Sequence, residues 1–198
     1  MKKLTFITTL LFVCNLLMAQ LKTGDFIKLS SFKDAKVSYT AEVTKVNGTS
    51  FICKFLHSQS QYTFINFAAQ PNSTYNFTAQ VKASQGAYKA GDVAVFNVNR
   101  PDNNTLTLAN FDSYMNNDQY VYDTHIRIVV RFADGKKYLA GGRKTADNKL
   151  NLTFFHSKAE YTVDLATMKV TYSNGGYLLG SKVVMYAAKW VSHATIKH

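Results

Sequence analysis

Two nearly identical stretches decide the fold of this protein: FLHSQSQYT at Phe55–Thr63 and FFHSKAEYT at Phe154–Thr162. They lie 99 residues apart in a chain of 198 residues. At this shift, residues 25–64 match residues 124–163 without gaps at nine of forty positions. The matched pairs are Ile27/Ile126, Tyr39/Tyr138, Ala41/Ala140, Lys45/Lys144, Phe55/Phe154, His57/His156, Ser58/Ser157, Tyr62/Tyr161 and Thr63/Thr162. Self-similarity at a fixed distance indicates a repeated structural unit.

A second match follows in the same order but at a shift of 89 residues. It pairs GAYKAGDVAVF at residues 86–96 with GGYLLGSKVVMY at residues 175–186. The smaller shift indicates that the first copy contains a longer excursion around residues 66–85. Two matches in one order predict a tandem duplication of a whole domain.

These matches predict the organisation of the chain. The Asn- and Asp-rich stretch between the copies contains Pro101 and has the composition of a connector. The predicted parts are a signal peptide at residues 1–19, a first β-domain at 22–99, a connector at 100–121, a second β-domain at 122–188 and a C-terminal tail at 189–198.

Apolar side chains alternate along the predicted strands. The series that share one face of an extended chain are Phe51, Cys53 and Phe55, and Leu150, Leu152 and Phe154. Alternation with aromatic and β-branched residues predicts strands. Asn-Gly and Asp-Gly pairs between them predict turns. No window after the first twenty residues favours an amphipathic helix, so the chain is expected to be all-β.

About five strands in each copy predict a small barrel. Tyr39–Val43 resembles the second strand, and Ile52–Phe55 the third strand, of SH3-like and Tudor-like small barrels. This resemblance implies the fold alone. Tudor domains follow the third strand with an acidic-aromatic-glycine turn, where this chain has Leu56-His57-Ser58. The resemblance therefore carries no methylated-ligand cage over to this chain.

The first twenty residues have the pattern of a secretory signal peptide. Lys2 and Lys3 precede an apolar stretch at residues 4–18, and small Ala19 follows. A short signal that starts with lysines is typical of bacteria, so we expect export to the periplasm or the cell surface. Two alternatives stay open: an uncleaved N-terminal anchor and a lipid on Cys14. No later segment is apolar enough to span a bilayer.

The chain after the signal is expected to be basic. Removing Lys2 and Lys3 leaves 21 basic against 12 acidic side chains, a formal charge of +9. Residues 124–198 hold most of the surplus, with 12 basic and 4 acidic side chains. Such a charge attracts an acidic polysaccharide, lipid head groups or released nucleic acid. The alternative is charge that serves only solubility.

The repeated His-Ser pair has a structural and a functional interpretation. His57 and His156 continue the inward-facing series at the ends of their strands, and a serine then opens a turn. A ring nitrogen and a hydroxyl can each bond the backbone of such a turn, which favours a structural role. The residues of the alternative, two matching ligand grooves, are His57, Tyr62, His156 and Tyr161. A nucleophile–base pair is disfavoured, because adjacent strand residues point to opposite faces.

A basic hairpin in the second copy is the candidate for polyanion binding. Its sequence is DGKKYLAGGRK, and the candidate binding residues are Lys136, Lys137, Tyr138, Arg143 and Lys144. Basic side chains around an aromatic ring suit a polyanion or a sugar. The alternative is a solvated edge whose lysines prevent strand pairing.

Other chemistry has no motif in this sequence. No zinc-like spacing of His or Cys occurs, no phosphate-binding glycine loop, and no pair of carboxylates typical of a glycosidase. No cofactor and no metal are therefore expected. Cys53 lies in an alternating strand and is expected to be buried rather than reactive.

Together these features predict an exported, non-enzymatic binding protein of the cell envelope that recognises an acidic polymer or glycan. The alternative is a protein–protein interaction module, an inhibitor or an assembly factor, that uses a tyrosine-rich face. A third hypothesis is a hydrolase with a site between the copies, around His57 and His156.

Overall fold

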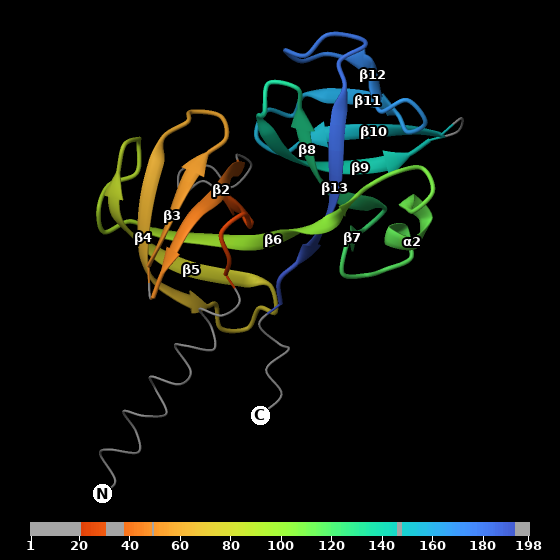
Figure 1. Ribbon diagram of the computed structural model, residues 1–198. Coiled ribbons are helices and arrows are strands. Elements are labelled where there is room, and N and C mark those ends of the chain that lie inside the picture. Colours follow the sequence, from red (N-terminus) through yellow and green to blue (C-terminus); the bar gives the residue numbers. More distant parts are fainter. Residues whose placement is uncertain (1–20, 31–37, 49, 146–147, 193–198) are drawn as a thin grey trace, which may run out of the picture. The chain divides into compact units, whose positions relative to one another are not determined.

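The fold is almost entirely β (Figure 1). The computed structural model describes residues 21–30, 38–48, 50–145 and 148–192. Within them the chain forms strands and one short helix, which confirms the prediction that the chain is all-β. The predicted signal peptide and the last six residues of the predicted tail lie outside the described residues.

The chain divides into two compact units. Unit 1 contains the described residues up to Asn99 together with Val191 and Ser192, and unit 2 is Arg100–Trp190. Each unit has its own core of buried apolar side chains.

Unit 1 contains a closed barrel of six antiparallel strands. The strands are β1 (Phe26–Ser30), β2 (Ser38–Asn47), β3 (Ser50–Phe55), β4 (Gln61–Ala69), β5 (Asn76–Ser84) and β6 (Val93–Thr105). Each strand pairs with the next along the chain, and β1 also pairs with β6, where Ile27 lies opposite Val98. The predicted number of about five strands is too low, because a sixth strand closes this barrel. The predicted excursion at residues 66–85 is a longer hairpin of β4 and β5.

Alternation fills the barrel of unit 1. Phe51, Cys53 and Phe55 on β3 are buried, as their spacing predicts. The ring of Phe51 stacks on Phe64 with centroids 5.1 Å apart and meets Phe96 edge-on at 5.7 Å. Burial raises the pKa of the Cys53 thiol far above its ordinary value, so this cysteine is a packed core residue and not a nucleophile.

The described residues of unit 2 form the end of β6, the helix α2 (Phe111–Met115) and the strands β7 to β13. The strands are β7 (Val121–Tyr122), β8 (His125–Phe132), β9 (Lys137–Lys144), β10 (Lys149–Phe154), β11 (Glu160–Asp164), β12 (Lys169–Ser173) and β13 (Val183–Trp190). Strands β8 to β12 follow one another in antiparallel order, and β13 pairs with β8. The chain that leads into β13 also bonds β12, where the NH of Val170 donates to the carbonyl of Ser181 at 3.0 Å.

The predicted connector at residues 100–121 is part of unit 2 rather than a linker. It contains the end of β6, the helix α2 and the start of β7. Its buried side chains Leu106, Phe111 and Tyr120 belong to the core of unit 2. The Tyr120 hydroxyl also donates to Asp102 Oδ2 at 2.7 Å. The stretch was predicted as a connector because Asn and Asp dominate its composition, while its few apolar residues are the ones that are buried.

The central strands of the two units have the same register. On β3, Cys53 lies opposite Val43 and Tyr62, and on β10, Leu152 lies opposite Gly142 and Tyr161. Every one of these positions differs by 99 between the units. Phe64 opposite Val81 likewise corresponds to Val163 opposite Val170, at shifts of 99 and 89.

One matched pair from the sequence is not equivalent in the structure. Ile27 lies opposite Ala41 in unit 1, whereas Ala140 lies opposite Ile128 in unit 2. The residue in the position of Ile27 is therefore Ile128 and not Ile126. Strand β8 is thus displaced by two residues relative to β1, which keeps its inward face apolar because strand side chains alternate with a period of two.

Each unit requires a glycine beside a buried tyrosine. A Cβ atom at Gly86 would overlap the hydroxyl of Tyr62, and one at Gly175 would overlap the hydroxyl of Tyr161. The two glycines match at the shift of 89 residues and the two tyrosines at 99. The repeated Tyr and Gly are therefore explained by a close approach between them.

Replacing Gly175 with alanine should lower the free energy of unfolding by about 1–3 kcal/mol, because the new methyl group overpacks against Tyr161. Denaturant unfolding measures this loss. Gly176→Ala is the matched control: a Cβ there has nothing within 4 Å, so its effect should stay within about 0.5 kcal/mol. Adding Tyr161→Phe to Gly175→Ala should restore part of the loss. Equal effects of the two alanine substitutions would contradict this account.

Candidate functional site

The repeated His-Ser pair lies in a turn that both units build with the same hydrogen bonds. After β3, the NH of Gln59 donates to the carbonyl of Phe55 at 3.0 Å, and the NH of Ser60 donates to the hydroxyl of Ser58 at 3.3 Å. The corresponding bonds after β10 join Lys158 to Phe154 at 2.8 Å and Ala159 to Ser157 at 3.2 Å. Both turns have a residue with φ of 59°. The serine thus has a local structural role.

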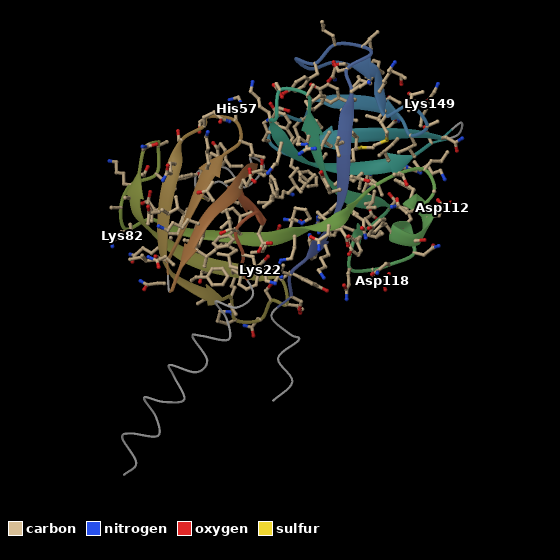
Figure 2. The ribbon with its side chains drawn as sticks, viewed as in Figure 1. Lys22, His57, Lys82, Asp112, Asp118 and Lys149 are labelled. Atoms are coloured by element: carbon tan, nitrogen blue, oxygen red, sulfur yellow. The ribbon has the colours of Figure 1, made fainter. Side chains whose placement is uncertain are left out.

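The two histidines differ in their surroundings. His57 is exposed on the surface of unit 1 (Figure 2). His156 is half-buried, and its ring stacks on Tyr138 with centroids 5.1 Å apart and planes 16° from parallel. Both strands end before their histidine, β3 at Phe55 and β10 at Phe154, so neither histidine lies on a strand. The prediction that both continue the inward series is wrong for His57, which is exposed, whereas His156 is half-buried against Tyr138.

Tyr62 and Tyr161, the predicted partners of the histidines, are core residues. They are 4% and 3% exposed. Tyr62 packs on Phe55 with centroids 4.6 Å apart, and Tyr161 packs on Phe154 at 4.7 Å. Their faces are covered by other rings, so the predicted pair of ligand grooves is not formed by these side chains.

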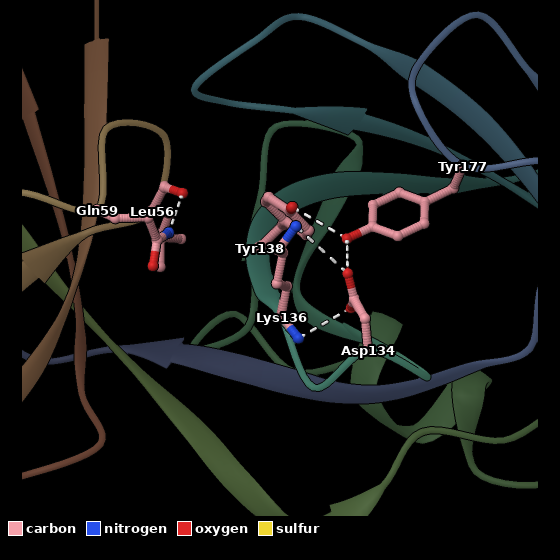
Figure 3. A network of polar contacts seen from close by, with 6 residues as sticks. All are labelled: Leu56, Gln59, Asp134, Lys136, Tyr138 and Tyr177. Carbon is pink, nitrogen blue, oxygen red and sulfur yellow. Dashed lines mark hydrogen bonds and ion pairs between the residues drawn. The ribbon is translucent and has the colours of Figure 1, made fainter.

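Tyr138 belongs to a polar network at one end of unit 2 (Figure 3). Its hydroxyl lies 3.0 Å from that of Tyr177, which donates to Asp134 Oδ2 at 3.0 Å. Burial, then the bonds to Tyr138 and Asp134, raise the pKa of Tyr177 well above its ordinary value. Burial also acts to raise the pKa of Asp134, but the backbone NH of Lys136, the Tyr177 hydroxyl and the Lys136 charge outweigh it and hold that pKa below its usual range.

The basic residues of the predicted patch are not brought together. Lys137 and Lys144 are the first and last residues of β9, so about 23 Å separates their backbones at the ordinary rise of a strand. Lys136 Nζ lies 3.5 Å from Asp134 Oδ2. Lys144 Nζ lies 3.0 Å from Oδ1 of Asp112. Asp112 belongs to α2 and is labelled in Figure 2. Lys136 and Lys144 thus each have a carboxylate partner, and an extended strand separates the two ends of the predicted patch.

A shallow pocket of about 220 Å³ lies on the outer face of unit 2. Its lining residues are His125, Arg143, Asn151, Leu152, Thr153, Glu160, Tyr161, Thr162 and Tyr172. Arg143 and Tyr161 are the two residues of the predicted site that line it. All the elements that contribute, from β8 to β12, belong to the same curved sheet.

Four of these side chains form a row across neighbouring strands. Arg143 lies opposite Asn151, Asn151 opposite Thr162, and Thr162 opposite Tyr172. Directly opposed residues in antiparallel strands share a face, so the row is continuous from β9 to β12. The Thr162 hydroxyl donates to Asn151 Oδ1 at 3.0 Å and orients that amide. The ring of Tyr172 is 51% exposed at the end of the row.

The row offers both polar bonds and an apolar ring face. Arg143 is exposed and makes no ion pair with any carboxylate in the described ranges. Its guanidinium is free to bind a carboxylate in a bidentate manner. Beside the pair of Asn151 and Thr162, the next outward pair on the same two strands is Thr153 opposite Glu160. The Glu160 carboxylate can accept hydrogen bonds from hydroxyl groups of a ligand. The exposed Tyr172 ring can pack against the apolar face of a ligand.

Seven lining residues were missed from the sequence: His125, Asn151, Leu152, Thr153, Glu160, Thr162 and Tyr172. Several of them occupy outward positions of their strands, and the alternation of apolar and polar residues in the sequence identifies such positions. Tyr172, an aromatic residue at an outward position, was the signal that could have indicated a binding surface. Which outward residues become neighbours depends on the register of β9 to β12, and register between strands cannot be read from one strand at a time.

Arg127 is a further basic residue that is withdrawn from the surface. It is 5% exposed, and its guanidinium lies 3.4 Å from the ring centroid of Trp190 and 5.2 Å from that of Tyr122. Burial lowers the pKa of Arg127 to about 9. Two aromatic faces thus stabilise its charge in place of a carboxylate, which makes it a packing element of unit 2.

Comparison with family models, curated proteins and solved structures finds no match for this chain. Among the described residues, no helix has the length and apolar character needed to cross a membrane. The same residues contain no group of three or more His, Cys, Asp or Glu side chains placed to hold a metal ion. The function must therefore be argued from the pocket itself.

Replacing His156 with alanine should lower the free energy of unfolding by about 1 kcal/mol, because it removes a ring stacked on Tyr138. His57→Ala should cost less than half as much, because His57 is exposed. Thermal or denaturant unfolding of the two single variants measures the difference. Equal losses in both would show that the turn itself, and not the stacked ring, needs the histidine.

Proposed function

We propose that this protein is an exported, non-enzymatic binding protein of the cell envelope, and that unit 2 recognises a glycan containing a carboxylate-bearing sugar. The observation that carries the proposal is the row Arg143–Asn151–Thr162–Tyr172 in an open pocket. Export rests on the signal-like pattern of residues 1–19.

The chemistry of the row fits a sugar better than a uniform polyanion. A saccharide presents hydroxyl groups that both donate and accept, and Asn151, Thr162 and Glu160 provide both kinds of partner. The C–H face of a sugar ring is apolar enough to pack on Tyr172. Arg143 supplies a planar fork for a sugar carboxylate. A negative Glu160 in the same pocket opposes dense anionic charge, which sets this ligand apart from a nucleic acid.

We also propose that the two units arose by tandem duplication and then diverged. The matched register of the central strands, the shared turn and the shared Tyr–Gly contact support this. At the positions of the row, unit 1 has Ile52 opposite Lys45 and Thr63, and Thr63 opposite Ala83, while a bulge in β2 displaces Thr44, which matches Arg143 at the shift of 99 residues. Unit 1 thus has a cation but lacks the amide and the ring, and only unit 2 is proposed to bind.

The differences between the units suggest a variant of unit 2 that should still fold, because its new side chains already occur in unit 1. Arg143→Thr with Tyr172→Ala gives unit 2 the side chains that unit 1 already carries on equivalent strands. We expect the wild type to bind uronic acid oligosaccharides in calorimetric titration and the double variant to bind at least tenfold more weakly, a loss of about 1.4 kcal/mol. Lys149→Gln, which removes one exposed charge outside the pocket, should leave the affinity unchanged.

Two results would overturn the proposal. The first is an equal loss in the double variant and in Lys149→Gln, which would assign binding to net charge. The second is the absence of binding to both acidic and matched neutral oligosaccharides at low salt. A series of salt concentrations separates the cases, because binding through diffuse charge falls steeply with salt while hydrogen bonds and ring packing do not.

The alternative of a tyrosine-rich interaction face has less support. The tyrosines shared by the two units, Tyr39, Tyr62, Tyr88, Tyr138, Tyr161 and Tyr177, pack against other rings within their own unit. Among the described residues, the exposed tyrosines are Tyr75, Tyr122 and Tyr172. Tyr172 is already part of the proposed glycan pocket.

A further inference from the structure

The loop that joins β12 to β13 exposes two leucines. Leu178 is 78% exposed and Leu179 is 67% exposed, the highest fractions among the large apolar side chains of the described residues. Neighbouring apolar side chains that stay exposed keep an unfavourable contact with water that no packing offsets, which is typical of an interaction surface. The residue before them, Tyr177, turns inward and stacks on Phe132 with centroids 3.5 Å apart.

The loop is fixed by the backbone. The NH of Ser181 donates to the carbonyl of Leu178 at 3.2 Å, and the NH of Gly180 donates to the carbonyl of Val170 at 2.8 Å. Gly180 has a φ of 81°, which favours glycine. The turn that carries the leucines is therefore defined by backbone hydrogen bonds, and the exposure of the two side chains follows from its conformation.

Two lysines lie at the base of this turn. Lys169 on β12 and Lys182 are directly opposed in an antiparallel bridge, and both are exposed. Directly opposed like charges are destabilising in a sheet. Asp164 also lies opposite Lys169 on β11, but its Oδ1 already accepts from the backbone NH groups of Ala166 and Thr167. The pair of ammonium groups would be neutralised by an anionic surface next to the leucines.

We propose that this loop docks the protein on an anionic lipid bilayer, with Leu178 and Leu179 in the interface and Lys169 and Lys182 at the head groups. Apolar side chains that insert beside basic residues are the usual chemistry of binding to a membrane surface. The +8 excess of formal charge in residues 124–198 adds long-range attraction. A lipid is favoured over a second copy of the chain, because a second copy would bring the same lysines together.

Unit 1 provides a natural comparison. The equivalent loop carries Lys89 and Ala90, and the NH of Asp92 donates to the carbonyl of Lys89 at 3.1 Å. Gly91 likewise bonds the carbonyl of Val81 at 2.8 Å. The turn thus forms without leucines, so replacing the two leucines should not disturb the fold.

The test uses residues 20–198 and vesicles of phosphatidylcholine with or without phosphatidylglycerol. Co-sedimentation should show binding to the anionic vesicles, at least tenfold weaker for Leu178→Gln with Leu179→Ala. Lys169→Gln with Lys182→Gln should weaken binding and reduce its salt dependence. Arg143→Thr with Tyr172→Ala should bind vesicles like the wild type, which separates this surface from the glycan pocket.

A fluorescent label reports insertion directly. Cys53 is buried and is the sole cysteine of residues 20–198, so an NBD group can be placed selectively on Leu179→Cys. Its emission should shift to the blue on anionic vesicles, while the same label on Ala90→Cys, the matching position of unit 1, should not shift. Unchanged binding without the leucines, equal shifts at both positions, or a dimer in light scattering that the leucine variant abolishes would overturn the proposal.

Discussion

The pairing of the first long strand of each unit with its last strand is the constraint on which the structure depends. In unit 1, β1 lies between β2 and β6, and in unit 2, β8 lies between β9 and β13. In unit 1 this double pairing closes the six strands into a barrel, and in unit 2 it joins β13 to the curved sheet of β8 to β12. Curvature then divides every strand into an inward series, which must be apolar, and an outward series, which is free to vary. The proposed glycan row belongs to the outward series.

A buried tyrosine in each unit restricts the loop that lies against it. The hydroxyl groups of Tyr62 and Tyr161 lie so close to Gly86 and Gly175 that no larger residue fits at these two positions without a shift. The two units keep this contact, yet unit 2 adds the hydrogen bond from Tyr177 to Asp134. Both units thus have the contact between tyrosine and glycine, but the hydrogen bonds near it differ between the units. The same division holds for the turn: its serine bonds are common to both units, while His57 is exposed and His156 is half-buried against a tyrosine.

The net charge of this protein suggests a large basic surface, but the surroundings of the individual basic side chains do not. The chain is strongly basic, but Lys136 and Lys144 have carboxylate partners and Arg127 lies between two rings. The basic side chains that stay available are dispersed, with Arg143 beside Asn151 and Lys169 opposite Lys182. A dispersed charge favours ligands that combine a few anionic groups with other contacts, such as an acidic sugar or a lipid surface. It disfavours a ligand that is recognised by charge density alone.

The sequence by itself determined the class of the fold and the repeated segments. Alternation at Phe51, Cys53 and Phe55 and its repeat 99 residues later depend on side-chain chemistry along one strand, which is a local property. Only the tertiary structure decided the number of strands in the barrel, the inclusion of residues 100–121 in unit 2, and which outward residues meet at the pocket. These depend on the register between strands that are distant in sequence. Register is set by how two faces pack together, and no single segment contains that information.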